Sequence, residues 1–336
     1  MRTGAATEAL PRRARRLGSP PLALVGPTAG GKTEASIALA RSLEAEIVVV
    51  DSMTVYRGMD VGTAKPTAAE RAAVPHHLLD LAEPSQPFSV AAFQAAARDA
   101  LAEIAGRGRA ALLVGGSGLY FRAVVDDLEF PGTDPVLRRL LDAEGRAVGA
   151  GRLHRRLADL DPAAAGKIDP ENLRRTVRAL EVAALTGRRF SSFAGGWDEY
   201  RGDRVVAAGV RIPPAVLTRR IERRVDRMLA GGLVDEVRAL LDLGAEPLLT
   251  ASQAIGYLEV VRMLRGELSE DEAGAEMLRR TKALARRQMA WFRRDPRIRW
   301  FDAGAEGAAG AIDEMEAYLR RSGRTSRRGR TNGDGT

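Results

Sequence analysis

The sequence predicts an α/β fold with a parallel, doubly wound sheet, and three observations support this prediction. Short apolar segments alternate with helical ones in the first half of the chain, as happens when helices cover both faces of a parallel sheet. The segment EIVVVD (46–51) is apolar without alternation, which is typical of a strand buried on both faces. From about residue 134 short helical stretches replace this order, and a strand returns at 205–210. We therefore expect a sheet-containing core with a helical insertion.

The elements of the first half follow from local patterns. LALVG (22–26) is an apolar strand that leads into a glycine-rich turn, and a helix follows over 33–44. After the strand 46–51, Ser89 is expected to cap a helix that ends at Gly106, because apolar residues between them recur at helical spacing. ALLVGG (111–116) is the next strand. Strands and helices thus alternate up to this point.

The insertion is expected to contain a helix over 171–186, with Pro170 just inside its start and Gly187 just past its end. The ends of the chain are rich in arginine and carry no apolar periodicity, so we expect a flexible arm and a disordered tail there. The expected division is a basic arm (1–19), a P-loop core with C-terminal helices (20–133 and 190–320), a helical insertion (134–189) and a disordered basic tail (321–336).

Composition excludes several classes of protein. The 336 residues include no cysteine and three histidines, which excludes disulfide-stapled folds, thiolate chemistry and cysteine-based zinc sites. There is no apolar run of about 20 residues that could cross a bilayer and no apolar core of a secretory signal, so we expect a cytoplasmic protein without membrane contact. The net charge of +8 favours a polyanionic partner, but only weakly, because a bias toward arginine could produce it.

The segment GPTAGGKT fits the pattern G-x-x-x-x-G-K-[ST], and it lies between a strand and a helix as that motif requires. Its backbone N–H groups and the helix N-terminus form a site for phosphate oxygens. The lysine adds a positive charge and the last hydroxyl can bind Mg²⁺. We therefore predict a di- or triphosphate site made by Gly26, Pro27, Thr28, Ala29, Gly30, Gly31, Lys32 and Thr33, with Thr33 as the metal ligand.

The residues around this motif favour group transfer over ATP hydrolysis. An NTPase usually holds Mg²⁺ with a carboxylate at the end of another apolar strand, but ALLVGG ends in glycines followed by Ser117. Asp51 ends the strand after the P-loop helix, at the edge where open α/β sheets bind ligands. It could act as a general base or metal ligand, or it could cap the turn that follows.

Eight stretches of the sequence then occur in a recognisable order: GPTAGGKT (26–33), DSMTVYRGMDVGTAKP (51–66), HHLLD (76–80), SVAAFQ (89–94), GGSGLY (115–120), RRTVRALEV (174–182), QAIGY (253–257) and ARRQMAWFRRD (285–295). In order and spacing they resemble the tRNA dimethylallyltransferase family, over about residues 20–302. The resemblance implies a P-loop core with a helical insertion. It also implies transfer of a dimethylallyl group from dimethylallyl diphosphate to N6 of adenosine 37, beside the anticodon, in tRNAs that read codons beginning with U.

The resemblance assigns four catalytic roles. Lys32, with the P-loop and Mg²⁺, stabilises the departing diphosphate, and Arg220 lies near it. Asp51 takes the proton from N6, and the Ser117 hydroxyl lies near the bridging oxygen. Serine stands at 117 where the family usually has threonine, Gly30 stands where serine is common, and Thr54 stands where glutamine is often found.

RNA contacts rest on both pattern and resemblance. The stretch 279–300 holds nine basic residues and three interleaved aromatic ones, which suits single-stranded loops, although we expect Trp291 or Phe292 to fill the core. The insertion helix has a basic face that could equally be solvated. The resemblance implies tRNA contacts at Asp51, Ser52, Met53, Thr54, Ser117, Arg138, Arg174, Arg175, Arg178, Gln253, Gly256, Tyr257, Arg286, Arg287, Gln288, Trp291 and Arg293.

Other functions stay open at this level. A P-loop kinase of small molecules would use the same phosphate site, and a related enzyme would prenylate free adenine nucleotides. A non-enzymatic RNA-binding protein would leave the phosphate site unexplained. The adjacent His76 and His77 are not expected to bind a metal, because their side chains diverge and no third histidine is near. The resemblance implies that this pair belongs to the core fold. The resemblance favours a monomer whose partners are dimethylallyl diphosphate and the anticodon stem-loop of tRNA.

Overall fold

The computed structural model describes residues 19–126, 128–244 and 254–331. Within them, parallel strands form a six-stranded sheet of order β3-β2-β4-β1-β5-β6. Neighbours in the sheet are distant in sequence, as expected when helices connect parallel strands. This confirms the predicted α/β class. The strands are β1 (Leu22–Val25), β2 (Ala45–Val50), β3 (His76–His77), β4 (Ala110–Gly115), β5 (Val206–Arg211) and β6 (Ile298–Asp302).

Two apolar cores cover the two faces of the sheet. Alternate residues of β1 enter different cores, because successive side chains of a strand point to opposite faces: Ala23 and Val25 pack on one side, and Leu22 and Leu24 on the other. The first core is completed by α3 (Val90–Gly106), α4 (Gly118–Val125), α9 (Pro214–Ala230), α10 (Leu233–Asp242), α11 (Tyr257–Leu264) and α12 (Glu270–Phe292). The second is completed by α1 (Lys32–Ser42), the 3-10 helix η3 (Gly307–Ala311) and α13 (Ile312–Thr331).

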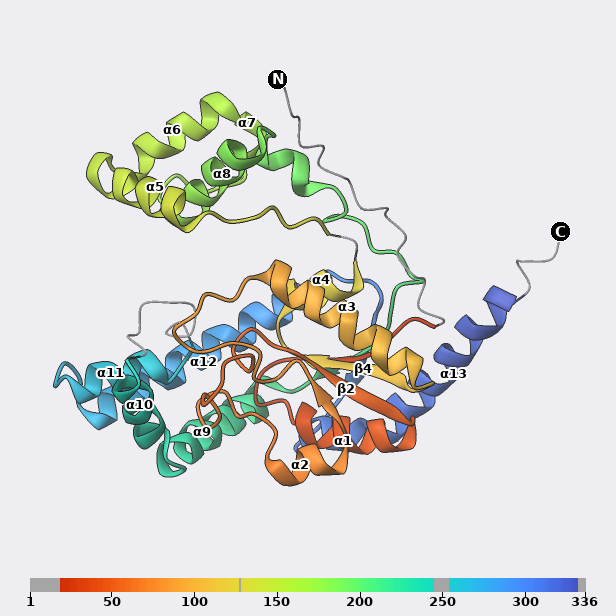
Figure 1. Cartoon of the computed structure of the whole chain (residues 1–336). Coiled ribbons are helices and arrows are strands. Elements are labelled where there is room, and N and C mark those ends of the chain that lie inside the picture. The colour runs from red at the N-terminus through yellow and green to blue at the C-terminus, as the bar shows by residue number, and fades with distance from the viewer. Residues whose placement is uncertain (1–18, 127, 245–253, 332–336) are drawn as a thin grey trace, which may run out of the picture.

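The insertion has an apolar core of its own, built around Leu153, Leu157 and Leu180. Figure 1 shows its helices grouped together apart from the sheet, with two chain segments connecting them to the core domain. They are α5 (Pro135–Val148), α6 (Ala150–Leu160), α7 (Pro162–Ala165) and α8 (Leu173–Thr186). The 3-10 helix η1 (Phe190–Ala194) packs against the core of the insertion through Phe190, and α2 (Ala68–Ala73) lies outside these groups.

Some element boundaries differ from those expected. The helix predicted over 171–186 begins at Leu173, because the Asn172 side chain accepts a hydrogen bond from the Arg175 N–H and so caps it. Pro170 therefore lies before the helix rather than inside it. Gly187 ends the helix in a left-handed conformation, as expected. Ser89 caps α3 through a 3.1 Å hydrogen bond from the Ala92 N–H.

The C-terminal region also differs from the expectation of disorder from 321. α13 continues to Thr331, and its arginines are residues of high helix propensity. Composition alone does not reveal this, because a disordered basic segment and a basic helix can have the same residues. No helix of the described part of the chain is long and apolar enough to cross a membrane.

Candidate active site

Three chain segments meet at the carboxyl edge of the sheet. The P-loop (residues 26–33) follows β1, Asp51 follows β2, and Ser117 follows β4. In the sheet register, Gly115 lies opposite Val25 on one side and Val50 on the other. The three strand ends are therefore neighbours. Ligands bind at this edge in open α/β sheets.

The P-loop has the backbone geometry of an anion site. Ala29 and Gly31 adopt left-handed conformations, with φ of 59° and 80°, and the Gly30 N–H donates to the Pro27 carbonyl at 3.2 Å. Gly31 has no side chain to cap the first N–H groups of α1, so they can face a phosphate. A Cβ at Gly30 would lie 2.8 Å from the Pro27 carbonyl oxygen. The glycine at this position therefore suits this tight turn.

Lys32 lies folded over the P-loop. Its Nζ donates to the Gly26 and Pro27 carbonyls at 3.0 and 2.7 Å. Burial, helped by repulsion from Arg224 and opposed by attraction from Asp51, lowers the pKa of Lys32 to about 7. Thr33, the expected metal ligand, is exposed in the first turn of α1.

Two arginines of α9 complete the positive side of the site. The Arg220 Nε donates to the Ala29 carbonyl at 2.8 Å, which places its guanidinium against the P-loop as expected. Arg224 donates to the Thr63 carbonyl at 3.2 Å. Burial lowers the pKa of Arg224, while the Asp51 carboxylate opposes that shift. Sequence analysis gave no role to Arg224, because it lies in a run of arginines (219–227) that also contains Glu222 and Asp226, so local ion pairs could account for it.

The segment before α13 covers the outer side of the P-loop. The Ala308 N–H donates to the Gly30 carbonyl at 2.9 Å. Gly307 has a φ of 66°, and a Cβ there would lie 2.9 Å from both the Gly30 oxygen and the Arg220 Cζ. Arg220 is thus held between Gly307 and Gly31. No local sequence pattern indicated this contact.

Asp51 caps the turn that follows it, which is one of the three roles considered for it, and it also lies near two cationic side chains. One carboxylate oxygen accepts from the Met53 N–H at 2.8 Å and so caps the turn, while the carboxylate interacts electrostatically with Lys32 and Arg224. Ser52 and Met53 are half-buried. Thr54 is 5% exposed, and its hydroxyl has no hydrogen-bond partner among the described residues.

The loop after Asp51 is fixed by one buried lysine. The Lys65 Nζ donates to the Tyr56 carbonyl, Asp60 and Asp80 at 2.6, 2.7 and 2.6 Å. Burial alone would raise the pKa of Asp80, but hydrogen bonds from Lys65 and Arg71 hold that pKa below its ordinary value. The loop that carries the expected acceptor-facing residues is therefore rigidly anchored.

Glu236 of α10 holds the same loop from the other side, and sequence analysis gave no sign of it. Its carboxylate accepts the N–H groups of Asp60, Val61 and Gly62 at 2.8, 2.8 and 3.1 Å, and the Tyr257 hydroxyl at 2.5 Å. Burial and this carboxylate raise the pKa of Tyr257.

Two of the three residues expected as RNA contacts at the 253–257 turn, Gly256 and Tyr257, are buried in the structure. Tyr257 is 5% exposed, and a Cβ at Gly62 would lie 2.4 Å from its ring. Gly256 is buried as well, and its N–H donates to Glu259 at 2.8 Å. Tyr257 therefore supports the loop after Asp51 from inside the protein, whereas Gly256 lies at the start of α11 near Leu233 and Met277. Gln253 lies outside the described residues.

Glycines let the end of β4 approach its neighbours closely. A Cβ at Gly115 would lie 2.0 Å from the Val50 carbonyl oxygen, one at Gly116 would lie 2.4 Å from the Gln288 Nε2, and one at Gly118 would lie 2.9 Å from the Trp291 ring. Ser117 stands between them as the N-cap of α4. Its hydroxyl makes no capping bond to the described helix backbone, so it can face a ligand.

Helix α12 divides its predicted RNA contacts between a buried and an exposed face. Arg286, Arg287 and Arg293 are exposed. Gln288 is 8% exposed, and its Oε1 accepts the Thr28 N–H at 2.7 Å. Phe292 is buried against Phe121, which confirms that one aromatic residue of this pair fills the core.

Trp291, unlike the buried Phe292 beside it, is exposed to solvent. It is 43% exposed, and its ring centroid lies 6.4 Å from that of Trp197. Trp197 belongs to the segment that returns from the insertion, so this pair joins that segment to the helix that borders Ser117.

The arginines of the insertion also have different environments. Glu181 is fully buried and accepts from Arg138, Arg178 and the Asp134 N–H at 2.5, 2.7 and 3.0 Å. Arg178 also donates to the Pro131 carbonyl at 2.7 Å. These two arginines hold the segment that enters the insertion, whereas Arg174 and Arg175 are exposed at the start of α8.

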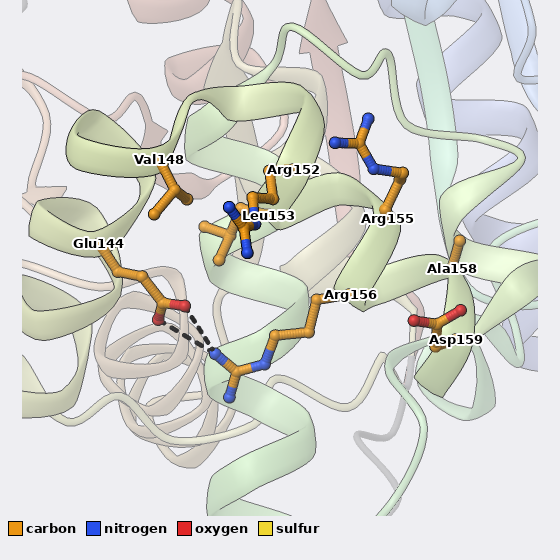
Figure 2. A pocket seen from close by; sticks show the side chains of 8 residues that line it. All are labelled: Glu144, Val148, Arg152, Leu153, Arg155, Arg156, Ala158 and Asp159. Carbon is orange, nitrogen blue, oxygen red and sulfur yellow. Dashed lines mark hydrogen bonds and ion pairs between the residues drawn. The ribbon is translucent and has the colours of Figure 1, made fainter.

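A hollow of about 590 Å³ lies between α5 and α6. Figure 2 shows Arg156 reaching from α6 to Glu144 of α5, which it contacts at 3.0 Å. Glu144, Val148, Arg152, Leu153, Arg155, Arg156, Ala158 and Asp159 line it. These residues belong to the insertion, and none of them is among the expected catalytic residues.

The acidic and histidine side chains of the described residues form no cluster of three or more that could hold a metal ion. His76 and His77 form β3, and the His77 Nε2 lies 2.7 Å from Glu46. A Mg²⁺ ion at this edge would therefore depend on few protein ligands. Such sites are usual where substrate phosphates supply most of the oxygen atoms.

Comparisons with known proteins agree on one family. A family model described as IPP transferase matches residues 54–295. The tRNA dimethylallyltransferase of Salinispora tropica is 54% identical over 284 residues, which cover 84% of this chain and 88% of that protein. The corresponding protein of Streptomyces coelicolor is 51% identical over 283 residues, covering 84% and 90%.

Solved structures are similar as well. The full-length tRNA isopentenylpyrophosphate transferase of Bacillus halodurans has a TM-score of 0.69 and 39% identity, covering 94% of this chain and all of that one. The Staphylococcus epidermidis tRNA delta(2)-isopentenylpyrophosphate transferase has a TM-score of 0.65 and 31% identity, covering 90% and 100%.

Proposed function

Because this chain belongs to the IPP transferase family, we propose that it is a tRNA dimethylallyltransferase. It transfers the dimethylallyl group of dimethylallyl diphosphate to N6 of adenosine 37, in tRNAs that read codons beginning with U. The observation that carries this proposal is the meeting of Lys32, Asp51 and Ser117 at one edge of the sheet. A site for a diphosphate and a candidate base are thereby adjacent.

The positive side of the site suits a departing diphosphate. As the bond between the allyl carbon and the bridging oxygen breaks, negative charge gathers on the diphosphate. The P-loop N–H groups, Lys32 and Arg220 can stabilise that charge, and one such donor is commonly worth about 2.7–4 kcal/mol. The Thr33 hydroxyl and the phosphate oxygens can hold Mg²⁺, which supplies further positive charge when bound. The Ser117 hydroxyl can donate to the bridging oxygen.

The acceptor side needs a base, because N6 of adenine is a weak nucleophile until it loses a proton. Asp51 has one carboxylate oxygen fixed by the Met53 N–H, which leaves the other to accept the N6 proton as the bond from N6 to the allyl carbon forms. The base must leave the RNA stack to reach this site. The anchoring of the following loop by Lys65 and Glu236 keeps Asp51 in place.

The exposed arginines favour RNA over free adenine nucleotides as the acceptor. Arg175, Arg286, Arg287 and Arg293 lie on exposed surfaces of α8 and α12 or at the C-terminal end of α12. A nucleotide acceptor needs no such surface, whereas RNA phosphates do. We propose that tRNA binds these arginines. We also propose that the enzyme is a monomer and that it works in the cytoplasm.

A transfer assay tests the proposal. Two anticodon stem-loops, one with adenosine and one with guanosine at position 37, are each incubated with dimethylallyl diphosphate and Mg²⁺. The mass of each RNA is then measured by mass spectrometry. We expect one dimethylallyl group on the adenosine RNA alone. If neither RNA gains a dimethylallyl group and ATP is hydrolysed in a parallel reaction, the result would instead support a P-loop kinase.

A further inference from the structure

The side chain of Gln288 lies in the wall of the site, although the resemblance places it among the RNA contacts. Its Oε1 accepts the Thr28 N–H of the P-loop at 2.7 Å, across 260 positions of sequence. Its Nε2 lies so close to Gly116 that a Cβ there would be 2.4 Å away. One buried amide therefore joins the segments that follow β1 and β4.

We propose that Gln288 is a positioning residue that couples RNA binding on α12 to diphosphate binding in the P-loop. This inference rests on the proposed function, since it needs both substrates to meet at this edge. Gln288 acts through the backbone at Thr28, and it touches neither substrate.

The geometry of α12 supports the coupling. Gln288 faces the sheet edge, while Arg286 and Arg287 just before it are exposed to solvent. The next turn is fixed as well, because Phe292 packs in the core and Trp291 lies against Gly118. RNA that binds the arginines therefore acts on a helix whose opposite face contacts the P-loop and the segment around Ser117.

The hydrogen bond to Thr28 is costly to lose. Both this partly buried N–H and the buried Gln288 amide would lose a partner, so the P-loop conformation and the position of α12 depend on each other. Coupling between two binding sites is reciprocal. RNA that stabilises this position of α12 should tighten diphosphate binding, and diphosphate should tighten RNA binding by the same factor.

Calorimetry with pyrophosphate, with and without a saturating stem-loop RNA, tests the coupling. In the wild type we expect RNA to tighten pyrophosphate binding by about fivefold or more. The variant Gln288→Met keeps the length of the side chain but removes the acceptor. It should weaken pyrophosphate binding about tenfold in the absence of RNA, and RNA should no longer tighten it. Its affinity for RNA alone should stay within about twofold of wild type.

Two further variants separate coupling from a direct contact or a folding defect. Gly116→Ala displaces the Gln288 amide from the other side and should reproduce the loss of coupling with α12 unchanged. Arg287→Gln, one residue away on the exposed face, should weaken RNA binding and leave pyrophosphate binding unchanged. A cooperative thermal unfolding transition would show that each variant is folded.

The proposal is overturned if Gln288→Met weakens RNA binding while pyrophosphate binding stays at the wild-type level, because Gln288 would then be an RNA contact. It is also overturned if wild-type pyrophosphate binding does not respond to RNA. Failure of the proposed function looks different, since the wild-type enzyme would then not alkylate the stem-loop at all.

Discussion

At the scale of single residues, the active site depends on places where only glycine fits. Gly115 allows the end of β4 to lie beside Val50, and Gly116 and Gly118 allow α12 to reach the same edge. The sequence indicates a turn at these glycines, but it does not reveal which neighbours they contact. Those neighbours come from β2 and α12, far away in the chain, and only the folded sheet brings them together.

Gly115→Ala should destabilise the protein by about 1–3 kcal/mol or more, because the new Cβ would clash with the Val50 backbone. Chemical denaturation measures this change. Gly151→Ala in α6 is the matched control, since a Cβ there meets no atom within 4 Å among the described residues, and it should stabilise by about 0.4–1 kcal/mol. Equal stabilities for the two variants would contradict the close packing of β4.

The lowered pKa of Lys32 predicts that diphosphate binding depends on pH. Its pKa of about 7 in the free site means that it loses its charge as the pH rises above that value. Bound diphosphate favours the charged form of Lys32 and so raises its pKa. At a pH between the pKa of the free site and that of the occupied site, Lys32 therefore takes up a proton when diphosphate binds. The affinity for pyrophosphate should therefore fall as the pH rises above about 7, with no contribution from this group well below it.

Calorimetry at about pH 8 in buffers of different ionisation enthalpy measures the proton uptake. Lys32→Arg is the control, because arginine stays charged at this pH and its binding should take up about one proton fewer. The same proton count for both proteins would show that Lys32 is already charged in the free site.

At the scale of elements, α8 shows how one residue type serves two purposes. Arg175 and Arg178 read alike in the sequence, and both belong to a basic stretch. In the structure Arg178 pairs with the buried Glu181 and holds the entry to the insertion, whereas Arg175 is exposed. The fold of residues 131–133 makes this difference, and no local pattern contains it.

Arg175→Ala should weaken tRNA binding and reduce the slope of its dependence on log salt concentration by about 1, because one phosphate contact is lost. Folding stability should not change. Arg178→Ala provides the contrast, since it leaves the fully buried Glu181 with fewer donors and should cost about 1–3 kcal/mol of stability. An unchanged salt slope for Arg175→Ala would make Arg175 a solvated surface residue.

At the scale of the whole molecule, local patterns were enough to predict the sheet, the P-loop and an interruption by helices. A strand buried on both faces appears in the sequence as a continuous apolar run, and the P-loop appears as a fixed pattern of glycine, lysine and threonine. The support around the site was not predictable in the same way. Arg224, Glu236 and Gln288 each bind at least one partner 161 or more positions away, and each is an ordinary polar residue of an amphipathic helix.

The proposed function joins donor and acceptor chemistry at one edge of the sheet and assigns most RNA contacts to exposed arginines outside that edge. Removing the base should therefore separate catalysis from binding. Asp51→Ala removes the oxygen that accepts the N6 proton, but it changes none of the exposed arginines. Loss of general-base catalysis commonly costs about 10²–10⁴ in rate.

Single-turnover transfer of the dimethylallyl group to full-length tRNA, measured beside tRNA binding for wild type and Asp51→Ala, tests the central claim most directly. We expect transfer by the variant to fall by about 10² or more, with tRNA affinity within about twofold of wild type. Transfer near the wild-type rate would contradict the assignment of Asp51 as the base at this edge of the sheet.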